Sequence, residues 1–239
     1  MTKCVAVVLA AGSGQRMMSK TKKQYMPLLG KPLLYYSLNA FEKSDIITGV
    51  VLVTSSEDIE WVRENIVDKY LFKKVMSIVP GGKERYHSVY EGIKNAPSDT
   101  DYIFIHDCAR PMIDEDIINR SYKDVLEHKA VVVGMPAKDT VKIADEEGFV
   151  KDTPDRKKVW VIQTPQVFDH TLIRSAYEGL IDKEDELLKN NVNITDDAMA
   201  VELITGSKVF LSEGSYENIK VTTPDDIAVA EGFLRGRNI

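Results

Sequence analysis

Short apolar runs alternate with stretches of helical spacing along residues 1–135. The apolar runs lie at residues 5–9, 50–53, 75–79, 102–105 and 131–135. Runs of this length are typical of strands that are buried on both faces of a parallel sheet. Between them the sequence predicts helices over residues 33–41, 57–67, 84–95 and 115–127. This alternation predicts an α/β fold, with a Rossmann-like, mostly parallel sheet that is flanked by helices and connected in the right-handed sense.

The pattern changes after residue 135. Residues 139–144 and 148–150 predict two short strands that are joined by a turn. A hairpin inserted into a compact domain has little of its own to bury, so we expect it to pack against a partner subunit. The chain shows no repeat, low-complexity segment or linker. It is therefore interpreted as a single domain over residues 1–239, with a protruding β-hairpin arm at about residues 137–158.

The last third of the chain returns to regular elements. Strands are predicted at residues 159–163, 208–211 and 218–221, and helices at residues 168–180, after residue 195 and after residue 223. Thr195 and Thr223 are the expected N-caps of the last two helices. Pro224 suits the first turn of the final helix, because proline lacks an N–H that would be unpaired there in any case.

Composition and charge narrow the class of protein. An apolar fraction of 44% in 239 residues suits a soluble globular protein with a large core, and the net charge of −6 argues against nucleic acid as a partner. The N-terminus does not resemble a signal peptide, and no apolar run approaches the about 20 residues of a membrane helix. Two cysteines are too few for a disulfide framework. We therefore expect a cytoplasmic protein without membrane contact.

A loop of small residues follows the first predicted strand: Ala10, Ala11, Gly12, Ser13 and Gly14. Glycines in such a loop let the backbone approach a ligand closely and leave amide groups available to an anion. Basic residues follow at once, among them Arg16 and Lys23, and these can neutralise a bound phosphate. We interpret the loop as a binding site for a nucleoside triphosphate.

The two commonest nucleotide-binding loops do not fit this sequence. A dinucleotide-binding loop needs a third glycine where Met17 stands, and an acidic residue after the second strand, where Thr54, Ser55 and Ser56 stand. A P-loop needs a Lys-Ser or Lys-Thr pair directly after its last glycine, and Gln15 and Arg16 stand there instead.

Two further strand ends carry unusual residues, at positions 81–85 and 107–110. In open α/β sheets, ligands bind beyond the carboxyl ends of the strands. We therefore expect these segments to meet the first loop in a glycine-lined, cationic site with one carboxylate.

Short motifs follow one another in order along the chain: Ala10-Ala11-Gly12-x-Gly14-x-Arg16-Met17, Lys23-Gln24-Tyr25, Gly81-Gly82-x-Glu84-Arg85-x-x-Ser88-Val89, His106-Asp107-x-Ala109-Arg110-Pro111, Asp139-Thr140-Val141, Asp155-Arg156, Gln163-Thr164-Pro165-Gln166-x-Phe168, Ile194-Thr195-Asp196 and Asn218-Ile219-Lys220-Val221-Thr222. Together they resemble the nucleotidyltransferases that join a nucleoside triphosphate to a sugar phosphate or polyol phosphate. Within that group they resemble most the 2-C-methyl-D-erythritol 4-phosphate cytidylyltransferase family. The resemblance implies transfer of a cytidylyl group from CTP to 2-C-methyl-D-erythritol 4-phosphate, giving 4-diphosphocytidyl-2-C-methyl-D-erythritol and pyrophosphate, a step of the non-mevalonate route to isoprenoids.

The resemblance also implies the site residues. Arg16, Lys23 and Lys220 are expected to be catalytic, through the charge they place on the reacting phosphates. Contacts to CTP are expected from Ala10, Ala11, Gly12, Ser13, Gly14, Gly81, Gly82, Lys83, Ser88, Asp107 and Cys108. Contacts to the acceptor substrate are expected from Asp107, Arg110, Thr140, Arg156, Thr164 and Lys220.

The implied cofactor is Mg²⁺, bound through the phosphates of CTP. Asp107 is a candidate ligand of that ion, and its carboxylate could equally cap the next segment. Thr140 and Arg156 lie on the predicted arm, which the resemblance places against the site of the other subunit of a homodimer.

Lys83 and His87 stand where the family pattern often has acidic residues, and Cys108 replaces a common alanine. We interpret Cys108 as a small buried apolar residue rather than as a nucleophile. Two alternative functions remain beside the first. One is a ribitol-5-phosphate cytidylyltransferase, and the other is an inactive nucleotide-binding regulator, against which the cations Arg16, Lys23 and Lys220 argue together.

Overall fold

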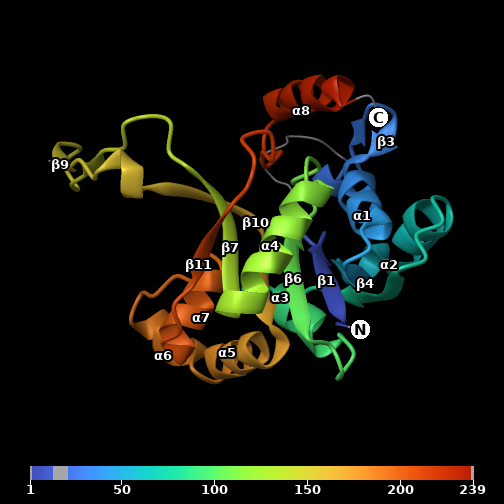
Figure 1. The fold of residues 1–239 in the computed structure, drawn as a ribbon, viewed down its shortest axis with the longest axis horizontal. Coiled ribbons are helices and arrows are strands. Elements are labelled where there is room, and N and C mark those ends of the chain that lie inside the picture. Colours follow the sequence, from blue (N-terminus) through green and yellow to red (C-terminus); the bar gives the residue numbers. More distant parts are fainter. Residues whose placement is uncertain (1, 13–20, 238–239) are drawn as a thin grey trace.

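The computed structural model describes residues 2–12 and 21–237, and a mixed β-sheet forms its centre (Figure 1). Within these residues the sheet has seven strands in the order β11-β7-β10-β6-β1-β4-β5. Their bounds are β1 Cys4–Leu9, β4 Ile47–Thr54, β5 Val75–Pro80, β6 Tyr102–Asp107, β7 Ala130–Pro136, β10 Trp160–Asp169 and β11 Phe210–Glu213. All neighbours are parallel except β10, which is antiparallel to β6 and β7. The predicted mostly parallel α/β sheet is confirmed.

Helices cover both faces of the sheet because the central strands are apolar on both sides. On one face, Ala6 and Val8 of β1 pack in a cluster with α1 (Leu33–Lys43), α2 (Ile59–Val62) and α4 (Glu115–His128). On the other face, Val5 and Val7 pack with helices α3, α5 and α7. The bounds of these three are α3 Arg85–Lys94, α5 His170–Asp182 and α7 Asp197–Thr205. No helix within residues 2–12 and 21–237 combines the length and apolarity needed to cross a membrane.

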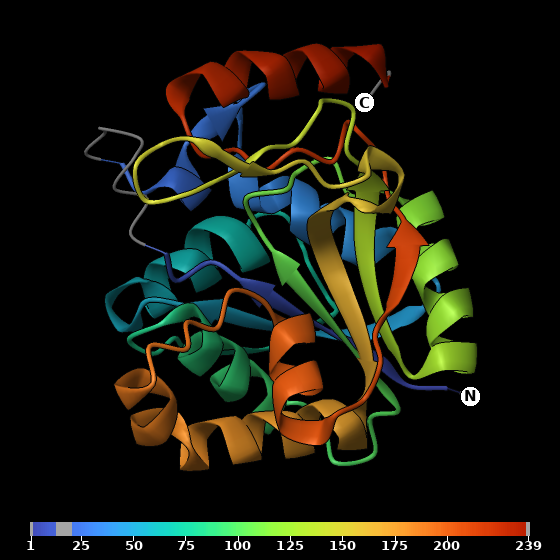
Figure 2. The ribbon, with the colours of Figure 1, turned by 90° about the vertical axis from the view of Figure 1, so that its left-hand side faces the viewer.

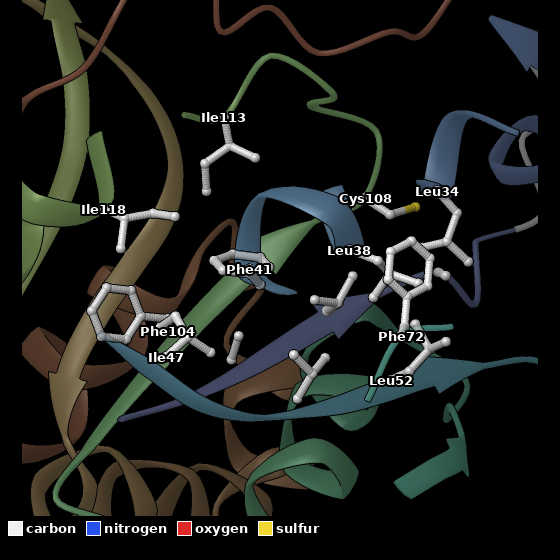
Figure 3. Close-up of a cluster of buried hydrophobic side chains, with 14 of the residues drawn as sticks. Leu34, Leu38, Phe41, Ile47, Leu52, Phe72, Phe104, Cys108, Ile113 and Ile118 are labelled. Carbon is white, nitrogen blue, oxygen red and sulfur yellow. The ribbon is translucent and has the colours of Figure 1, made fainter. Parts of the chain in front are cut away.

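Figure 3 shows the cluster on the first face, where Leu38 and Phe41 of α1 lie over Leu52 of β4 and Phe104 of β6. All four side chains are at most 1% exposed. Burial of a leucine or phenylalanine side chain contributes about 1.5–3 kcal/mol. The strand ends that carry the candidate site therefore rest on a well-packed core.

The final helix α8 (Pro224–Gly236) covers a small hairpin of β2 (Pro27–Leu28) and β3 (Lys31–Pro32). Leu234 of the helix packs in one cluster with Leu28 of the hairpin. Lys220 lies in the segment that precedes α8, and this packing fixes the end of that segment.

A second hairpin, of β8 (Ile143–Ala144) and β9 (Val150–Asp152), projects from the sheet between β7 and β10 (Figures 1 and 2). Phe149 in this arm is 68% exposed and Val150 is 61% exposed. Large apolar side chains at such exposure are typical of a surface that binds another protein.

Several element boundaries differ from the sequence-based prediction, among them the strands of the arm, which are Ile143–Ala144 and Val150–Asp152 rather than residues 139–144 and 148–150. Strand β10 continues to Asp169, beyond its predicted end at residue 163, and α5 begins at His170 rather than at residue 168. The reason is that Val167 and Phe168 are fully buried and extend the antiparallel ladder with β6. The predicted helix at residues 57–67 is a 3-10 turn Ser56–Asp58, then α2, then a π-helical turn Arg63–Asp68.

Two further local predictions are wrong. Residues 218–221 are not a strand but an irregular segment, in which the N–H of Val221 donates to the carbonyl oxygen of Ala109 at 2.8 Å. The N-cap of α7 is Asp196 rather than Thr195, because the Asp196 carboxylate accepts the Met199 N–H at 2.9 Å. The prediction for α8 is confirmed, with Thr223 as its N-cap and Pro224 in its first turn.

Candidate active site

A cavity of about 430 Å³ opens at the carboxyl ends of β1, β5 and β6. The residues selected from the sequence that line it are Ala10, Ala11, Gly12, Lys23, Gly82, Lys83, Ser88, Asp107, Cys108 and Lys220. Ser13, Gly14 and Arg16 lie outside the described residues. The structure thus brings together the strand ends that the parallel sheet was expected to align.

Two glycines let the loop after β5 approach the loop after β1. A Cβ atom on Gly81 would lie 2.6 Å from the Cβ of Ala11 and 2.7 Å from the Oγ of Ser88. A Cβ atom on Gly82 would lie 2.3 Å from the Cβ of His87. Any side chain at either position would therefore displace the loop. The close approach also brings the Gly82 N–H to the Oγ of Ser88, which accepts its hydrogen bond at 3.1 Å.

Lys23 reaches the cavity from a short 3-10 helix, Lys23–Tyr25. The buried Gln24 beside it donates from Nε2 to the carbonyl oxygen of Ala10 at 2.7 Å, which ties this turn to the first loop. The neighbouring Lys22 has a different role, because its Nζ forms ion pairs with Glu57 and Asp58, each at 2.7 Å.

Asp107, the last residue of β6, has a carboxylate that is 13% exposed at the cavity. Its Oδ1 accepts from the Nε of Arg85 at 3.2 Å, and its Oδ2 accepts from the Nζ of Lys220 at 2.6 Å. Burial acts to raise the pKa of Asp107, but the positive charges of Arg85 and Lys220 outweigh it and hold that pKa well below its usual value. The carboxylate is therefore an anion at neutral pH.

Arg85 in the first turn of α3 also binds a second carboxylate, on the side away from the cavity. Its Nη1 and Nη2 donate to the two oxygens of Asp197, at 2.8 Å and 2.9 Å, a bidentate pair. Asp197 is fully buried at the start of α7 and also accepts from the Tyr177 hydroxyl at 2.5 Å. Burial acts to lower the pKa of Arg85, but the charges of Asp197 and Asp107 raise it well above its usual value. Arg85 is thus a fixed cation, oriented from the protein interior.

Arg110 and Thr164, both predicted as substrate contacts, lie behind the cavity lining. The Nη1 of Arg110 donates to the carbonyl oxygen of Asn218 at 2.8 Å, which supports the segment that carries Lys220. The hydroxyl of Thr164 accepts the backbone N–H of Asp107 at 3.1 Å. In this chain the two side chains therefore fix Lys220 and Asp107 in place.

Two residues beside Asp107 are buried and uncharged. His106 is fully buried, and burial lowers its pKa to about 3, so its imidazole is neutral. Burial likewise raises the pKa of the Cys108 thiol to about 12. Cys108 is therefore a protonated, apolar wall residue, in agreement with the interpretation from the sequence.

Thr140 and Arg156 lie on the arm, away from the lining of the cavity in their own chain. The Nη1 of Arg156 donates to the carbonyl oxygen of Lys138 at 2.9 Å, within the exposed arm.

The sequence motifs include Arg85 without indicating a role for it, and Asp197 and Tyr177 were not selected. One signal was present for Arg85, because a cation in the first turn of a helix opposes the helix dipole and suggests a tertiary partner. Nothing in the pair Asp196-Asp197 indicates which carboxylate is buried.

Comparison with known proteins gives full-length matches. The family model described as 2-C-methyl-D-erythritol 4-phosphate cytidylyltransferase matches residues 4–236. A protein of that description from Lachnoclostridium phytofermentans is 46% identical over 235 residues, which cover 98% of this chain and 97% of the relative. Another, from Caldanaerobacter subterraneus subsp. tengcongensis, is 45% identical over 230 residues, covering 96% and 98%. The crystal structure of a 4-diphosphocytidyl-2C-methyl-D-erythritol synthase from Anaerococcus prevotii is similar with a TM-score of 0.83 and 32% identity, covering 98% of this chain and 96% of that one.

Proposed function

This chain belongs to the 2-C-methyl-D-erythritol 4-phosphate cytidylyltransferase family, and from that premise we propose that it transfers the cytidylyl group of CTP to 2-C-methyl-D-erythritol 4-phosphate. The products are 4-diphosphocytidyl-2-C-methyl-D-erythritol and pyrophosphate. The observation that carries the proposal is the cavity itself: within the family match, Lys23, Arg85 and Lys220 line it together with Asp107, the carboxylate at the end of β6.

In the proposed reaction, an oxygen of the acceptor phosphate attacks the α-phosphorus of CTP. The bond between that phosphorus and the oxygen bridging to the β-phosphate breaks, and the electron pair leaves with pyrophosphate. Both reactants are anions and negative charge spreads over the transferred group, so the protein contributes mainly position and electrostatic stabilisation. We assign Lys23 to the triphosphate and Lys220 to the reacting phosphates. Arg16, outside the described residues, is the third proposed cation.

Asp107 and Arg85 together can keep Lys220 ready for a phosphate. In the ligand-free chain Lys220 pairs with Oδ2 of Asp107, while Arg85 occupies Oδ1. Lys220 can therefore turn toward a bound phosphate without leaving Asp107 as an isolated buried charge, because Arg85 keeps its own bond to that carboxylate. Arg110 supports the change by holding the carbonyl of Asn218, two residues before Lys220.

The two loops are assigned to different parts of CTP. The first loop, residues 10–14, is proposed to bind the phosphates through its backbone amides. The loop at residues 81–83, with Ser88, is proposed to bind the cytosine base. Cys108 forms the adjoining wall of the cavity.

Mg²⁺ is the proposed cofactor. In nucleotide-dependent enzymes this ion is bound by one or two carboxylates together with substrate phosphates and water. Among the residues that the structure describes, no group of three or more His, Cys, Asp and Glu side chains could hold a metal ion. We propose that Mg²⁺ would be bound chiefly through phosphates, and that Oδ2 of Asp107 would become available to it once Lys220 turns toward a bound phosphate. When bound, the ion would neutralise part of the phosphate charge.

The arm is proposed to form a homodimer and to bring Thr140 and Arg156 to the acceptor phosphate in the site of the other subunit. The exposure of Phe149 and Val150 on the arm supports this assignment. A mixing experiment tests it. An Arg156→Ala variant and a Lys23→Ala variant, each inactive alone, should regain activity in mixed dimers, which contain one site with neither change. Purified mixed dimers without activity would contradict an arm that acts across the interface.

We propose that the enzyme is a single domain. We place it in the cytoplasm, because both of its cysteines are free thiols and suit a reducing compartment. Pyrophosphate release measures the proposed activity directly. With CTP and Mg²⁺, release is expected with 2-C-methyl-D-erythritol 4-phosphate and not with ribitol 5-phosphate. Release with ribitol 5-phosphate alone would overturn the substrate assignment. Binding of CTP without turnover on either acceptor would favour a regulator.

A further inference from the structure

His87 occupies the third position of α3 and faces the loop that lines the cavity. The N-cap of this helix is Glu84, and the Glu84 backbone N–H donates to the Nδ1 of His87 at 3.1 Å. Together the two residues form a capping box, in which the third helical residue is most often glutamate or glutamine. A backbone N–H can only donate. The Nδ1 atom of His87 must therefore be the unprotonated nitrogen of the ring.

The other ring nitrogen is anchored to helix α6 (Glu184–Lys189). Nε2 of His87 lies 3.1 Å from Oε1 and 3.2 Å from Oε2 of Glu184. The hydroxyl of Tyr86 donates to the same carboxylate at 2.6 Å, and this bond, followed by that from His87, lowers the pKa of Glu184. Glu184 is thus an anion, and Nε2–H of His87 donates to it. The imidazole is held at both nitrogens while only 23% of its side chain is exposed.

The ring also supports the neighbouring part of the loop. Gly82 lies so close to His87 that a Cβ atom there would be 2.3 Å from the His87 Cβ. The Gly82 N–H bonds to the Oγ of Ser88, and that hydroxyl donates to the carbonyl oxygen of Glu84 at 3.3 Å. Residues 82–84 are therefore fixed at one end by Ser88 and at the other by His87, and all three residues line the cavity.

We propose that His87 is a positioning residue for nucleotide binding, and that it holds the loop at residues 82–84 in its binding geometry only while Nδ1 is unprotonated. This inference rests on the proposed binding of CTP at that loop. Protonation would set two donors, Nδ1–H of His87 and N–H of Glu84, against each other. The ring would remain with Glu184, whose charge attracts an imidazolium more strongly, so the loop is the part that yields.

The surroundings of the ring define which charges act on it. Glu184 faces it from α6, Tyr86 stacks against it with ring centroids 4.4 Å apart, and Glu84 adjoins it at the start of α3. The positive charge of Lys83 also acts on Glu184 and helps to lower the pKa of that carboxylate. An acidic side chain at position 87, as in the family pattern, would accept the Glu84 N–H without a change of charge near neutral pH. A histidine makes the same contact only through an unprotonated Nδ1.

Three variants test the inference through the affinity for CTP at about pH 8 and about pH 5.5. His87→Gln keeps an acceptor that suits a capping box at both pH values. His87→Ala removes the acceptor at both. His128→Gln is the matched control, because His128 lies at the end of α4 against Phe210. The Kd of CTP from calorimetry and the KM for CTP are measured for each, and circular dichroism checks the fold.

The ratio of the wild-type Kd to that of His87→Gln is expected to rise about fivefold from the higher to the lower pH, the effect of one modest hydrogen bond. Taking this ratio cancels the titration of the phosphates of CTP. His87→Ala should bind CTP about fivefold more weakly than wild type at the higher pH and converge with it at the lower pH. The KM for the acceptor and kcat at saturating CTP should keep the wild-type pH profile, and His128→Gln should match wild type throughout.

A ratio that stays constant with pH would overturn the inference, and this comparison decides the matter even if His87→Ala does not fold. Equal affinities of wild type and folded His87→Ala at the higher pH would overturn it as well. Absence of CTP binding to the wild-type protein at either pH would instead overturn the proposed function.

Discussion

The change Asp197→Asn is expected to destabilise the protein while leaving its shape at that position almost unchanged. Asp197 is fully buried and accepts two hydrogen bonds from Arg85 and one from Tyr177. Asparagine keeps one acceptor oxygen but turns an NH₂ group toward a guanidinium N–H. It also removes the charge that balances Arg85.

The size of the effect follows from the geometry. Removing one partner of a buried ion pair costs about 3–5 kcal/mol. Arg85 keeps its bond to Asp107, and its side chain is 32% exposed, so the lower end of that range, about 3 kcal/mol, is expected. For a chain of this length, such a loss lowers Tm by roughly 6–12 °C. The change Tyr177→Phe removes a single hydrogen bond to the same carboxylate and should cost about 1.5 kcal/mol.

Urea unfolding followed by circular dichroism measures both free energies, provided that the m value stays that of the wild type. The change Asp185→Asn on the exposed surface of α6 is the control and should stay within about 0.5 kcal/mol of wild type. The double variant of Asp197 and Tyr177 should lose less than the sum of the single losses, because both changes remove the same hydrogen bond. A loss below about 1 kcal/mol for Asp197→Asn would refute the view that this carboxylate holds Arg85 in place.

The changes Lys23→Ala and Lys220→Ala each remove a cation from the cavity and should lower kcat at least about a hundredfold, while the circular dichroism spectrum of the folded protein is retained. Pyrophosphate release measures this, and a kcat near that of wild type would remove that lysine from the proposed mechanism. Gly81→Ala should raise the KM for CTP, because its Cβ would lie 2.6 Å from a methyl group of the first loop, whereas Gly232→Ala, at an open position, should not. Equal KM values for the two variants would contradict this packing. Burial lowers the pKa of His106 to about 3 in the folded chain, against about 6.5 for a free histidine, so stability present above about pH 6.5 is lost as the pH falls, by up to about 1.4 kcal/mol per unit. His106→Gln should reduce this slope between about pH 6.5 and pH 5 in urea unfolding, and equal slopes would show that His106 is not the group responsible.

The sheet was predictable because its signal is local. Val5, Val7, Ala6 and Val8 are apolar on both sides of one strand, and this pattern by itself requires helices on both faces. The glycines at positions 81 and 82 likewise marked their strand end as part of the site, whereas the close approach between the two loops is seen only in the structure. A hairpin in this region was predictable from the turn at residues 145–148, although the extent of its two strands was not. That the hairpin packs against a partner subunit stays a prediction.

The remaining features depend on partners that are distant in sequence. Arg85 meets Asp197 across 112 residues, and no local pattern indicates this pair. The polar residues Gln163 and Gln166 made β10 seem to end early. Both are buried and bonded, however, as in the 2.8 Å bond from the Ala198 N–H to the Oε1 of Gln166. Polar groups that are satisfied by tertiary contacts cannot be distinguished from a loop by composition.

The irregular segment at residues 218–221 determines when the site can exist during synthesis. Lys220 reaches Asp107 across 113 residues, and the sheet that carries Asp107 needs nothing beyond β11, which ends at Glu213. Because the ribosome adds residues in order, a nascent chain can pair its strands while the cavity still lacks this cation. Catalytic competence then becomes a late event, separate from the formation of the core. By the same reasoning, a proteolytic cut between β11 and Lys220 would abolish activity while the sheet remained folded.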